Sequence, residues 1–210
     1  MSVLSRRSGE PPRRGTPADL LVIGLGNPGS EFDKTRHNVG ADAVIAMAAR
    51  HGQTLSKGKE RALVAELRVG HHRVAVAFPQ TFMNNSGESV RLLARRFGVE
   101  EADKLVVIHD ELDLDVGRIK LKAGGGLAGH NGLRSITQHV GTTDYLRLRI
   151  GVGRPPASQL GRDYVLRRPG KSEQIELEHA IERSCDAIEQ LLADGLEATM
   201  NTVNRRAKDD

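Results

Sequence analysis

Residues 24–40 constrain the fold of this chain more than any other segment. They follow a short apolar run at 20–24 and precede a stretch with helical apolar spacing at 39–51. A buried strand is therefore expected to end in the turn Asn27-Pro28-Gly29, after which a polar loop leads into a helix. Ligands of α/β sheets bind where strands end at their carboxyl edge. We expect this loop, and its histidine His37, to face such a site.

Strand and helix signals alternate along the rest of the chain. Strands are predicted at 20–24, 63–69, 74–78, 105–109, 118–122 and 146–152, and helices at about 39–51, 87–97, 131–140 and 173–194. A turn around Gly70 joins two of these strands as a hairpin, which makes the sheet mixed. We predict one α/β domain at 19–205, a twisted mixed β-sheet flanked by helices, between a disordered tail at 1–18 and a C-terminal tail at 206–210.

Composition limits the class of protein. A chain of 210 residues is long enough for one sizeable core. Its one cysteine, Cys185, excludes an intramolecular disulfide and suits a reducing cytoplasm, and its position on the apolar stripe of the last helix predicts a core residue. No apolar stretch is long enough to span a bilayer. An arginine pair near the N-terminus has no hydrophobic region after it, so a twin-arginine export signal is rejected.

Charge is unevenly distributed along the chain. The net charge is +4, whereas residues 116–168 hold ten cations and two carboxylates, a local charge of +8. Such a basic lobe favours a polyanionic partner, with a solvated surface as the alternative. Cations alternate with apolar residues in the strands at 118–122 and 146–152, which places Lys120, Lys122 and Arg149 where phosphates could bind. Four Phe and two Tyr leave little capacity for base stacking, which favours a folded RNA recognised through its backbone.

His37 is a candidate general base, and Asp110 is its candidate partner. Asp110 follows the apolar strand at 105–109 and is expected at the same sheet edge as Asn27. A carboxylate bonded to imidazole fixes the tautomer of the ring and stabilises the imidazolium. No Gly-x-Ser-x-Gly elbow occurs, so water is the expected nucleophile. The acids between 110 and 115 offer an alternative, a site for a hard cation, but they lack complementing ligands elsewhere; we predict no metal and no cofactor.

The glycines at 24, 26 and 29 permit three interpretations. Their spacing matches a dinucleotide-binding fingerprint, but that motif requires a helix to open among the glycines, and polar residues 30–38 intervene here. A plain Pro28-Gly29 turn is the second interpretation. The third is a loop that positions Asn27 and His37, and it is the one we favour.

Two further polar segments flank predicted helices. Residues 81–87 follow the strand at 74–78, and the glycine-rich residues 124–132 lead into the helix at 131–140. Backbone N–H groups can approach a ligand closely in such glycine-rich loops. The amides of Asn84, Asn85 and Asn131 suit a peptide or a ribose, with a flexible loop without ligand as the alternative.

Together these segments resemble the bacterial peptidyl-tRNA hydrolases over residues 20 to about 205. The motifs, in the family's order, are Gly-Leu-Gly-Asn-Pro-Gly at 24–29, Thr-Arg-His-Asn at 35–38, Thr-Phe-Met-Asn at 81–84, His-Asp-Glu-Leu-Asp at 109–113, Gly-His-Asn-Gly at 129–132 and Leu-Arg-Ile-Gly at 148–151. The resemblance implies a monomeric, metal-independent enzyme that hydrolyses the ester joining a peptide to its tRNA and so recycles both.

The resemblance also implies roles for single residues. His37 would activate water, Asp110 would stabilise its working form, and Asn27 would help distinguish blocked from free amino groups. The implied substrate-binding residues are Phe32, Phe82, Met83, Asn84, His130 and Asn131, and the basic residues Lys122 and Arg149 would clamp the tRNA 5′ phosphate. The family usually has tyrosine at the position of Phe32, so a hydroxyl contact is absent there. A non-catalytic RNA-binding protein and a nucleotide-dependent oxidoreductase are the alternative classes.

Overall fold

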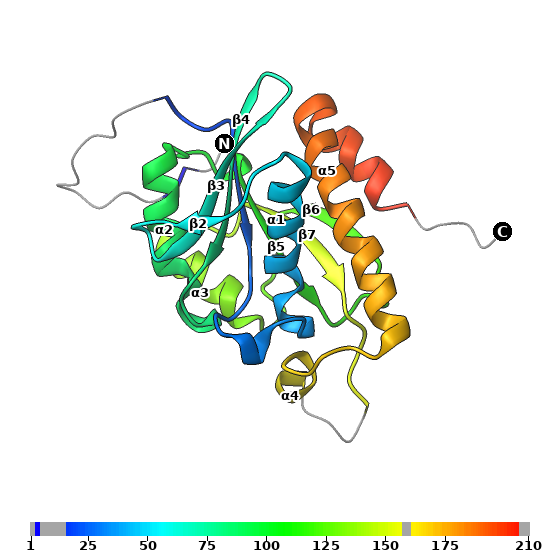
Figure 1. Ribbon diagram of the computed structural model, residues 1–210. Coiled ribbons are helices and arrows are strands. Elements are labelled where there is room, and N and C mark those ends of the chain that lie inside the picture. Colours follow the sequence, from blue (N-terminus) through cyan, green and yellow to red (C-terminus); the bar gives the residue numbers. More distant parts are fainter. Residues whose placement is uncertain (1–2, 5–15, 157–160, 206–210) are drawn as a thin grey trace.

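The fold is a seven-stranded sheet with helices on both faces (Figure 1). It is seen in a computed structural model that describes residues 3–4, 16–156 and 161–205. The elements are β1 (Leu20–Gly24), α1 (Val39–Arg50), β2 (Ser56–Lys57), β3 (Ala62–Val69), β4 (His72–Pro79), α2 (Ser86–Phe97), β5 (Leu105–Glu111), β6 (Ile119–Ala123), α3 (Asn131–Val140), β7 (Leu146–Gly151), α4 (Gly161–Val165) and α5 (Lys171–Val203). Four 3-10 turns lie at Ser30–Phe32, Arg36–Asn38, Met83–Asn85 and Ala102–Lys104.

The strand order is β2-β3-β4-β1-β5-β7-β6, which confirms the predicted mixed α/β sheet. The central strands β4, β1, β5 and β7 are parallel to one another, whereas the pairs β2–β3, β3–β4 and β6–β7 are antiparallel. The continuous apolar runs of β1 and β5 suit this centre, because strands there are covered on both faces. The parallel arrangement brings the carboxyl ends of β1 and β5 to one edge.

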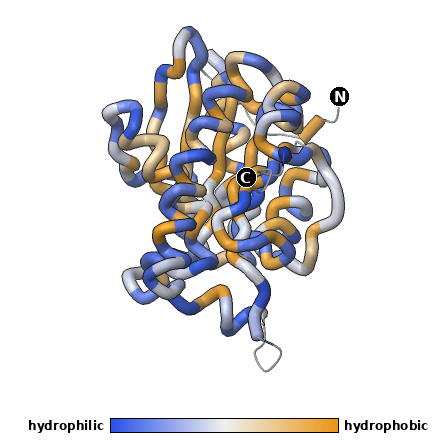
Figure 2. The backbone as a smooth tube through the Cα atoms, turned by 90° about the vertical axis from the view of Figure 1, so that its right-hand side faces the viewer, coloured by the Kyte–Doolittle hydropathy of each residue, from blue (hydrophilic) through white to orange (hydrophobic). Residues whose placement is uncertain are grey.

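Helices α1 and α5 cover one face of the sheet, and α2 and α3 cover the other (Figure 1). Alternate residues of β5 supply the two cores: Val106 and Ile108 pack on the α1–α5 side, and Leu105 and Val107 on the α2–α3 side. The apolar strands run through the interior, while the outward turns of the helices are hydrophilic (Figure 2).

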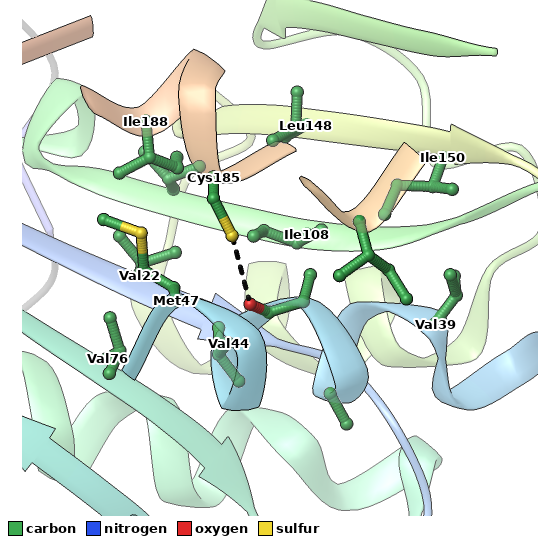
Figure 3. Close-up of a cluster of buried hydrophobic side chains, with 14 of the residues drawn as sticks. Val22, Val39, Val44, Met47, Val76, Ile108, Leu148, Ile150, Cys185 and Ile188 are labelled. Carbon is green, nitrogen blue, oxygen red and sulfur yellow. Dashed lines mark hydrogen bonds between the residues drawn. The ribbon is translucent and has the colours of Figure 1, made fainter. Parts of the chain in front are cut away.

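Cys185 lies in the core on the α1–α5 side, as predicted (Figure 3). Its thiol points toward the carbonyl oxygen of Ala43 at 3.9 Å, and the side chain is almost wholly buried. Burial raises the pKa of the thiol to about 12. The residue therefore fills space between α5 and α1 and is not a nucleophile.

Strand β5 and helix α5 are both longer than predicted. β5 continues through Asp110 and Glu111, because β7 pairs with them there. α5 continues beyond Gly195, where a non-helical φ of 81° kinks it. The sequence favours a helix end at this glycine, but the returning arm packs beside β6. There the side-chain amide of Asn204 both accepts from the N–H of Leu121 and donates to its carbonyl, each at 2.9 Å, which covers this edge strand.

The N-terminal segment differs from the predicted disordered tail at its described residues. Leu4 is buried, and its N–H donates to the carbonyl of Glu100 at 2.7 Å; the N–H of Ala18 donates to Phe97 at 2.8 Å. Most of the predicted tail at 1–18, and the tail at 206–210, lie outside the described residues. The short β2 and α4 were not predicted. Within the described ranges, no helix has the length and apolarity needed to cross a membrane.

Candidate active site

Two glycines bring the polar loop after β1 onto the sheet edge. A Cβ atom on Gly24 would overlap the carbonyl oxygen of Gly40, and a Cβ on Gly40 would overlap that of Ile108. Helix α1 can therefore begin directly against β1 and β5 only because both side chains are absent. The close packing assigns a structural role to Gly24. It opposes the dinucleotide interpretation, because α1 begins only at Val39.

Asn27 is held by hydrogen bonds on several sides. Its backbone N–H donates to Oδ1 of Asn38, and its carbonyl accepts from Nδ2 of Asn38, both at 2.9 Å. Its side-chain Oδ1 accepts from the backbone N–H of Met83 at 2.8 Å. The amide of Asn27 is thus fixed with Oδ1 toward the loop at 81–87, which leaves Nδ2 as a donor without a partner in the described part of the chain.

Asp110 joins two histidines that come from opposite faces of the sheet. Its Oδ1 accepts from Nδ1 of His37 at 2.9 Å and from Nε2 of His130 at 3.0 Å. His37 lies in the 3-10 turn before α1, and His130 is the N-cap of α3. Because Asp110 is near the end of β5, between these helices, its carboxylate can reach both rings. The predicted pair of His37 and Asp110 is therefore present, and His130 completes a triad.

The hydrogen bonds fix the tautomers of both rings. Nδ1 of His130 lies 3.1 Å from the N–H of Gly132, which donates to it, so this nitrogen carries the lone pair and Nε2 carries the proton given to Asp110. In His37 the proton lies on Nδ1, which donates to Asp110. Nε2 of His37 is then the unprotonated nitrogen, as a general base requires.

Burial and charge act in opposite directions on the two catalytic candidates. Burial disfavours the charged form of His37, but the charge and the hydrogen bond of Asp110 outweigh it and raise the pKa of the imidazole. Burial likewise opposes ionisation of Asp110, but the neighbouring His37 and His130 hold its pKa well below its usual range. The carboxylate therefore stays ionised and favours the imidazolium that forms after proton abstraction.

The same hydrogen bonds oppose a metal site. Ligand atoms of His37, Asp110 and His130 lie within 4.8 Å of one another, a spacing that a cation could bridge. The lone pair of His130, however, accepts the N–H groups that begin α3, so ligation through Nε2 would require the opposite tautomer and the loss of this cap. The neighbouring acids are also engaged: Glu111 pairs with Arg149 at 2.8 Å and Asp113 with Arg154 at 2.9 Å.

A cavity of about 260 Å³ lies beside the triad. Its walls come from the end of β5, the glycine-rich loop before α3 and helix α4. Both His37 and His130 border it, and so does Asn131. Among the described residues, no serine, threonine or cysteine lines it. This lining supports water as the nucleophile.

The other predicted substrate-binding residues lie outside this cavity's lining. Phe82 is 59% exposed, Asn84 is exposed and Phe32 is partly exposed, whereas Met83 is buried. Its backbone N–H donates to Asn27, and its sulfur packs against Gly132 at the start of α3. Their binding roles remain predictions.

The basic strands β6 and β7 hold both free and engaged cations. Lys122 is exposed, and its Nζ lies 2.8 Å from the place of a Cβ on Gly125, so it extends over the glycine-rich loop. Lys120 is opposite Arg149 in the register. Arg149 pairs with Glu111, and Arg147 is buried with its guanidinium bonded to the carbonyls of the glycine-rich loop. Although Arg147 lies on the same alternating strand as Arg149, its guanidinium is therefore not presented to a phosphate. The phosphate contacts of Lys120, Lys122 and Arg149 stay predictions.

Arg36 is a site residue that the sequence did not reveal. Its Nη1 donates to the carbonyls of Arg167 and Arg168 at 3.2 Å, and its Nη2 pairs with Glu173 at 2.5 Å. It thereby ties the turn that carries His37 to the segment that follows α4, and α4 itself forms one wall of the cavity. Its position next to His37 was the available signal, but a sequence does not distinguish a buried arginine from an exposed one.

A histidine bonded to a buried carboxylate, beside a cavity lined without a nucleophilic side chain in its described part, is an arrangement typical of hydrolases that activate water. Comparison with known proteins agrees. The model of the peptidyl-tRNA hydrolase family matches residues 21–210. This chain belongs to that family of hydrolases.

Relatives and solved structures give the same result. A peptidyl-tRNA hydrolase of Anaeromyxobacter sp. is 46% identical over 188 residues, which are 90% of this chain and 97% of that protein. One of Rhodococcus opacus is 49% identical over 185 residues, 88% of this chain and 97% of that protein. The crystal structure of peptidyl-tRNA hydrolase from Acinetobacter baumannii matches with a TM-score of 0.84 at 35% identity, covering 91% of this chain and 97% of that one.

Proposed function

We propose that this chain hydrolyses the ester bond between a peptide and its tRNA, with His37 as the general base. The hydrogen bond of 2.9 Å between Nδ1 of His37 and Oδ1 of Asp110 carries this proposal. It leaves Nε2 as the basic nitrogen and supplies the charge that stabilises the protonated ring. Family membership supplies the substrate class.

The reaction needs one proton to move twice. Nε2 of His37 takes a proton from water as the oxygen attacks the ester carbonyl, which gives a tetrahedral intermediate. The intermediate collapses by breaking the bond to the ribose oxygen, and the imidazolium of His37 returns the proton to that leaving group. The products are a peptide with a free carboxylic acid and a tRNA with a free terminal hydroxyl. Asp110 remains ionised throughout, because its pKa is held low.

The remaining residues bind and orient the substrate in this proposal. The side-chain amide of Asn27 is fixed, and its Nδ2 can donate to the carbonyl of the acyl group that blocks the amino group of the esterified residue. Asn131 borders the cavity, and the exposed Phe82 and Asn84 extend the surface beyond it. Lys120 and Lys122 contact tRNA phosphates from β6. The protein acts as a cytoplasmic monomer.

Two substrates test the activity. Purified protein is incubated with N-acetyl-aminoacyl-tRNA and with the same aminoacyl-tRNA unblocked, and release of free tRNA is followed. The proposal expects hydrolysis of the blocked substrate at a rate well above that of the unblocked one. Tight binding of both substrates without hydrolysis would instead favour the non-catalytic RNA-binding alternative. Binding of NAD(P) with no effect on either tRNA would favour the oxidoreductase.

A further inference from the structure

His109 is a buried histidine that the proposed mechanism does not use. It is 2% exposed in β5, directly after the apolar residues at 105–108. Its Nδ1 lies 2.7 Å from the carbonyl oxygen of Asp110 and must donate to it, which leaves Nε2 as an acceptor. Within the described ranges, Nε2 is buried without a partner. Burial of a polar ring with one nitrogen unsatisfied costs free energy, so a histidine here calls for a functional reason.

The carbonyl of Asp110, which accepts from His109, lies beyond the end of the neighbouring strand β1. Two residues earlier, the carbonyl of Ile108 accepts from the N–H of Leu25 at 3.0 Å, on the β1 side. The carbonyl of Asp110 points to the same side, because strand carbonyls alternate in direction. Strand β1 has already ended at Gly24. The ring of His109 therefore supplies the donor that a continuing β1 would have supplied, and it does so at the residue that carries the catalytic carboxylate.

The same ring supports His130. The side chain of His109 points to the α2–α3 face of the sheet, the face of Leu105 and Val107, and α3 begins above it at His130. The two rings meet edge to face, with centroids 5.0 Å apart and planes at 74°. His109 thus contacts the backbone of Asp110. It also contacts His130, whose ring is hydrogen-bonded to the carboxylate of Asp110.

Charged neighbours surround this ring. Burial is the first cause that lowers the pKa of His109 to about 3, with His130 and Arg147 acting in the same direction and Asp110 opposing them. The ring is therefore neutral at any pH near neutrality. A neutral ring can hold one fixed tautomer, as its hydrogen bond to Asp110 requires.

We propose that His109 is a positioning residue: it fixes the backbone of Asp110 and the ring of His130, so that the carboxylate of Asp110 stays bonded to His37. The inference rests on the proposed function, in which His37 is the base. Displacement of a catalytic group by about 1 Å can lower a rate by about 100-fold. Loss of this support should therefore act on turnover rather than on substrate binding.

Two substitutions separate the hydrogen bond from the filling of space. His109→Phe keeps a ring against His130 but loses the donor to Asp110, whereas His109→Asn keeps a donor at the position of Nδ1. Val107→Ala, on the same face of β5, is the control for lost packing alone. For each variant, the titration of the His37 ring is followed by NMR, and kcat and KM are measured with N-acetyl-aminoacyl-tRNA and corrected for the folded fraction.

We expect His109→Phe to lower kcat by about 10- to 100-fold with little change in KM, and to lower the pH at which His37 titrates. His109→Asn should restore both toward wild type, and Val107→Ala should change neither. A His37 titration and a kcat that stay at wild-type values in His109→Phe would overturn the inference. Because the titration needs no substrate, that result is distinct from failure of the proposed function, which shows as no hydrolysis by wild-type protein.

Discussion

The guanidinium of Arg36 lies 4.1 Å from the centre of the Tyr164 ring, so that the residue next to His37 in the sequence is stacked on helix α4. The hydroxyl of Tyr164 is itself anchored, donating to the carbonyl of Val152 at 2.8 Å. The turn that carries His37 and the wall of the cavity are therefore one connected unit. This connection requires the planar guanidinium of an arginine, because its edge bonds two carbonyls and a carboxylate while its face covers the ring of Tyr164.

Replacement of Arg36 by lysine tests this connection. Lysine keeps the charge but cannot bond Arg167, Arg168 and Glu173 together, so the free energy of unfolding should fall by about 2 kcal/mol, and kcat should fall by about tenfold as His37 loses its support. Urea melts and steady-state kinetics measure the two effects. Tyr164→Phe is the matched control: it keeps the ring under Arg36 and should leave kcat near wild type. Equal losses in both variants would contradict a specific role for Arg36.

Replacement of Gly40 by alanine tests the close approach of α1 to the sheet. The new Cβ would overlap the carbonyl oxygen of Ile108, and backbone cannot move aside as a flexible side chain can. We expect a loss of about 3 kcal/mol in the free energy of unfolding, measured by urea denaturation. Gly126→Ala is the control, because no atom lies within 4 Å of its Cβ. A stable Gly40→Ala variant would mean that the helix can shift without cost.

The main elements and the pair of His37 and Asp110 could be predicted because each depends on local signals. Apolar runs mark the central strands, and parallel strands bring their carboxyl ends to one edge, where both residues lie. Other features depend on tertiary context. The alternating pattern around Arg147 is typical of an exposed face, but β7 lies between β5 and β6, and the glycine-rich loop covers the guanidinium. His130 can donate to Asp110 only because its other ring nitrogen caps α3, and the residue pattern at 129–132 does not specify that tautomer.

The buried, neutral His109 predicts a dependence of stability on pH. Its pKa is about 3 in the folded chain and near 6.5 when exposed, so the unfolded state binds the extra proton between these values. Stability should therefore fall as the pH falls below about 6.5. His109→Phe removes this contribution. Relative to that variant, wild type should lose about 1.6 kcal/mol between pH 6.5 and 5.0, because the slope rises from half to nearly all of about 1.4 kcal/mol per unit over this range. Urea melts at both pH values measure the free energies of unfolding of wild type and His109→Phe. If their difference is the same at the two pH values, His109 is not a buried, neutral ring.

The exposed Lys122 predicts a salt-dependent contact with tRNA. A lysine that neutralises one phosphate releases about one counterion, so Lys122→Ala should weaken binding and reduce the slope of log affinity against log salt by about one. Fluorescence anisotropy with deacylated tRNA gives both values. Lys57→Ala, on the opposite sheet edge in β2, is the control and should leave the slope unchanged. Equal slopes for wild type and Lys122→Ala would assign the lysine to solvated surface.

The most direct test of the account is the single-turnover hydrolysis of N-acetyl-aminoacyl-tRNA by His37→Ala, with His71→Ala, an exposed histidine in the β3–β4 turn, as the control. Loss of a general base should lower the rate by about 10²- to 10⁴-fold while tRNA binding is unchanged, and His71→Ala should match wild type. The wild-type rate should fall with decreasing pH through the raised pKa of His37, since only the neutral ring accepts a proton. A His37→Ala rate close to that of wild type would contradict the account.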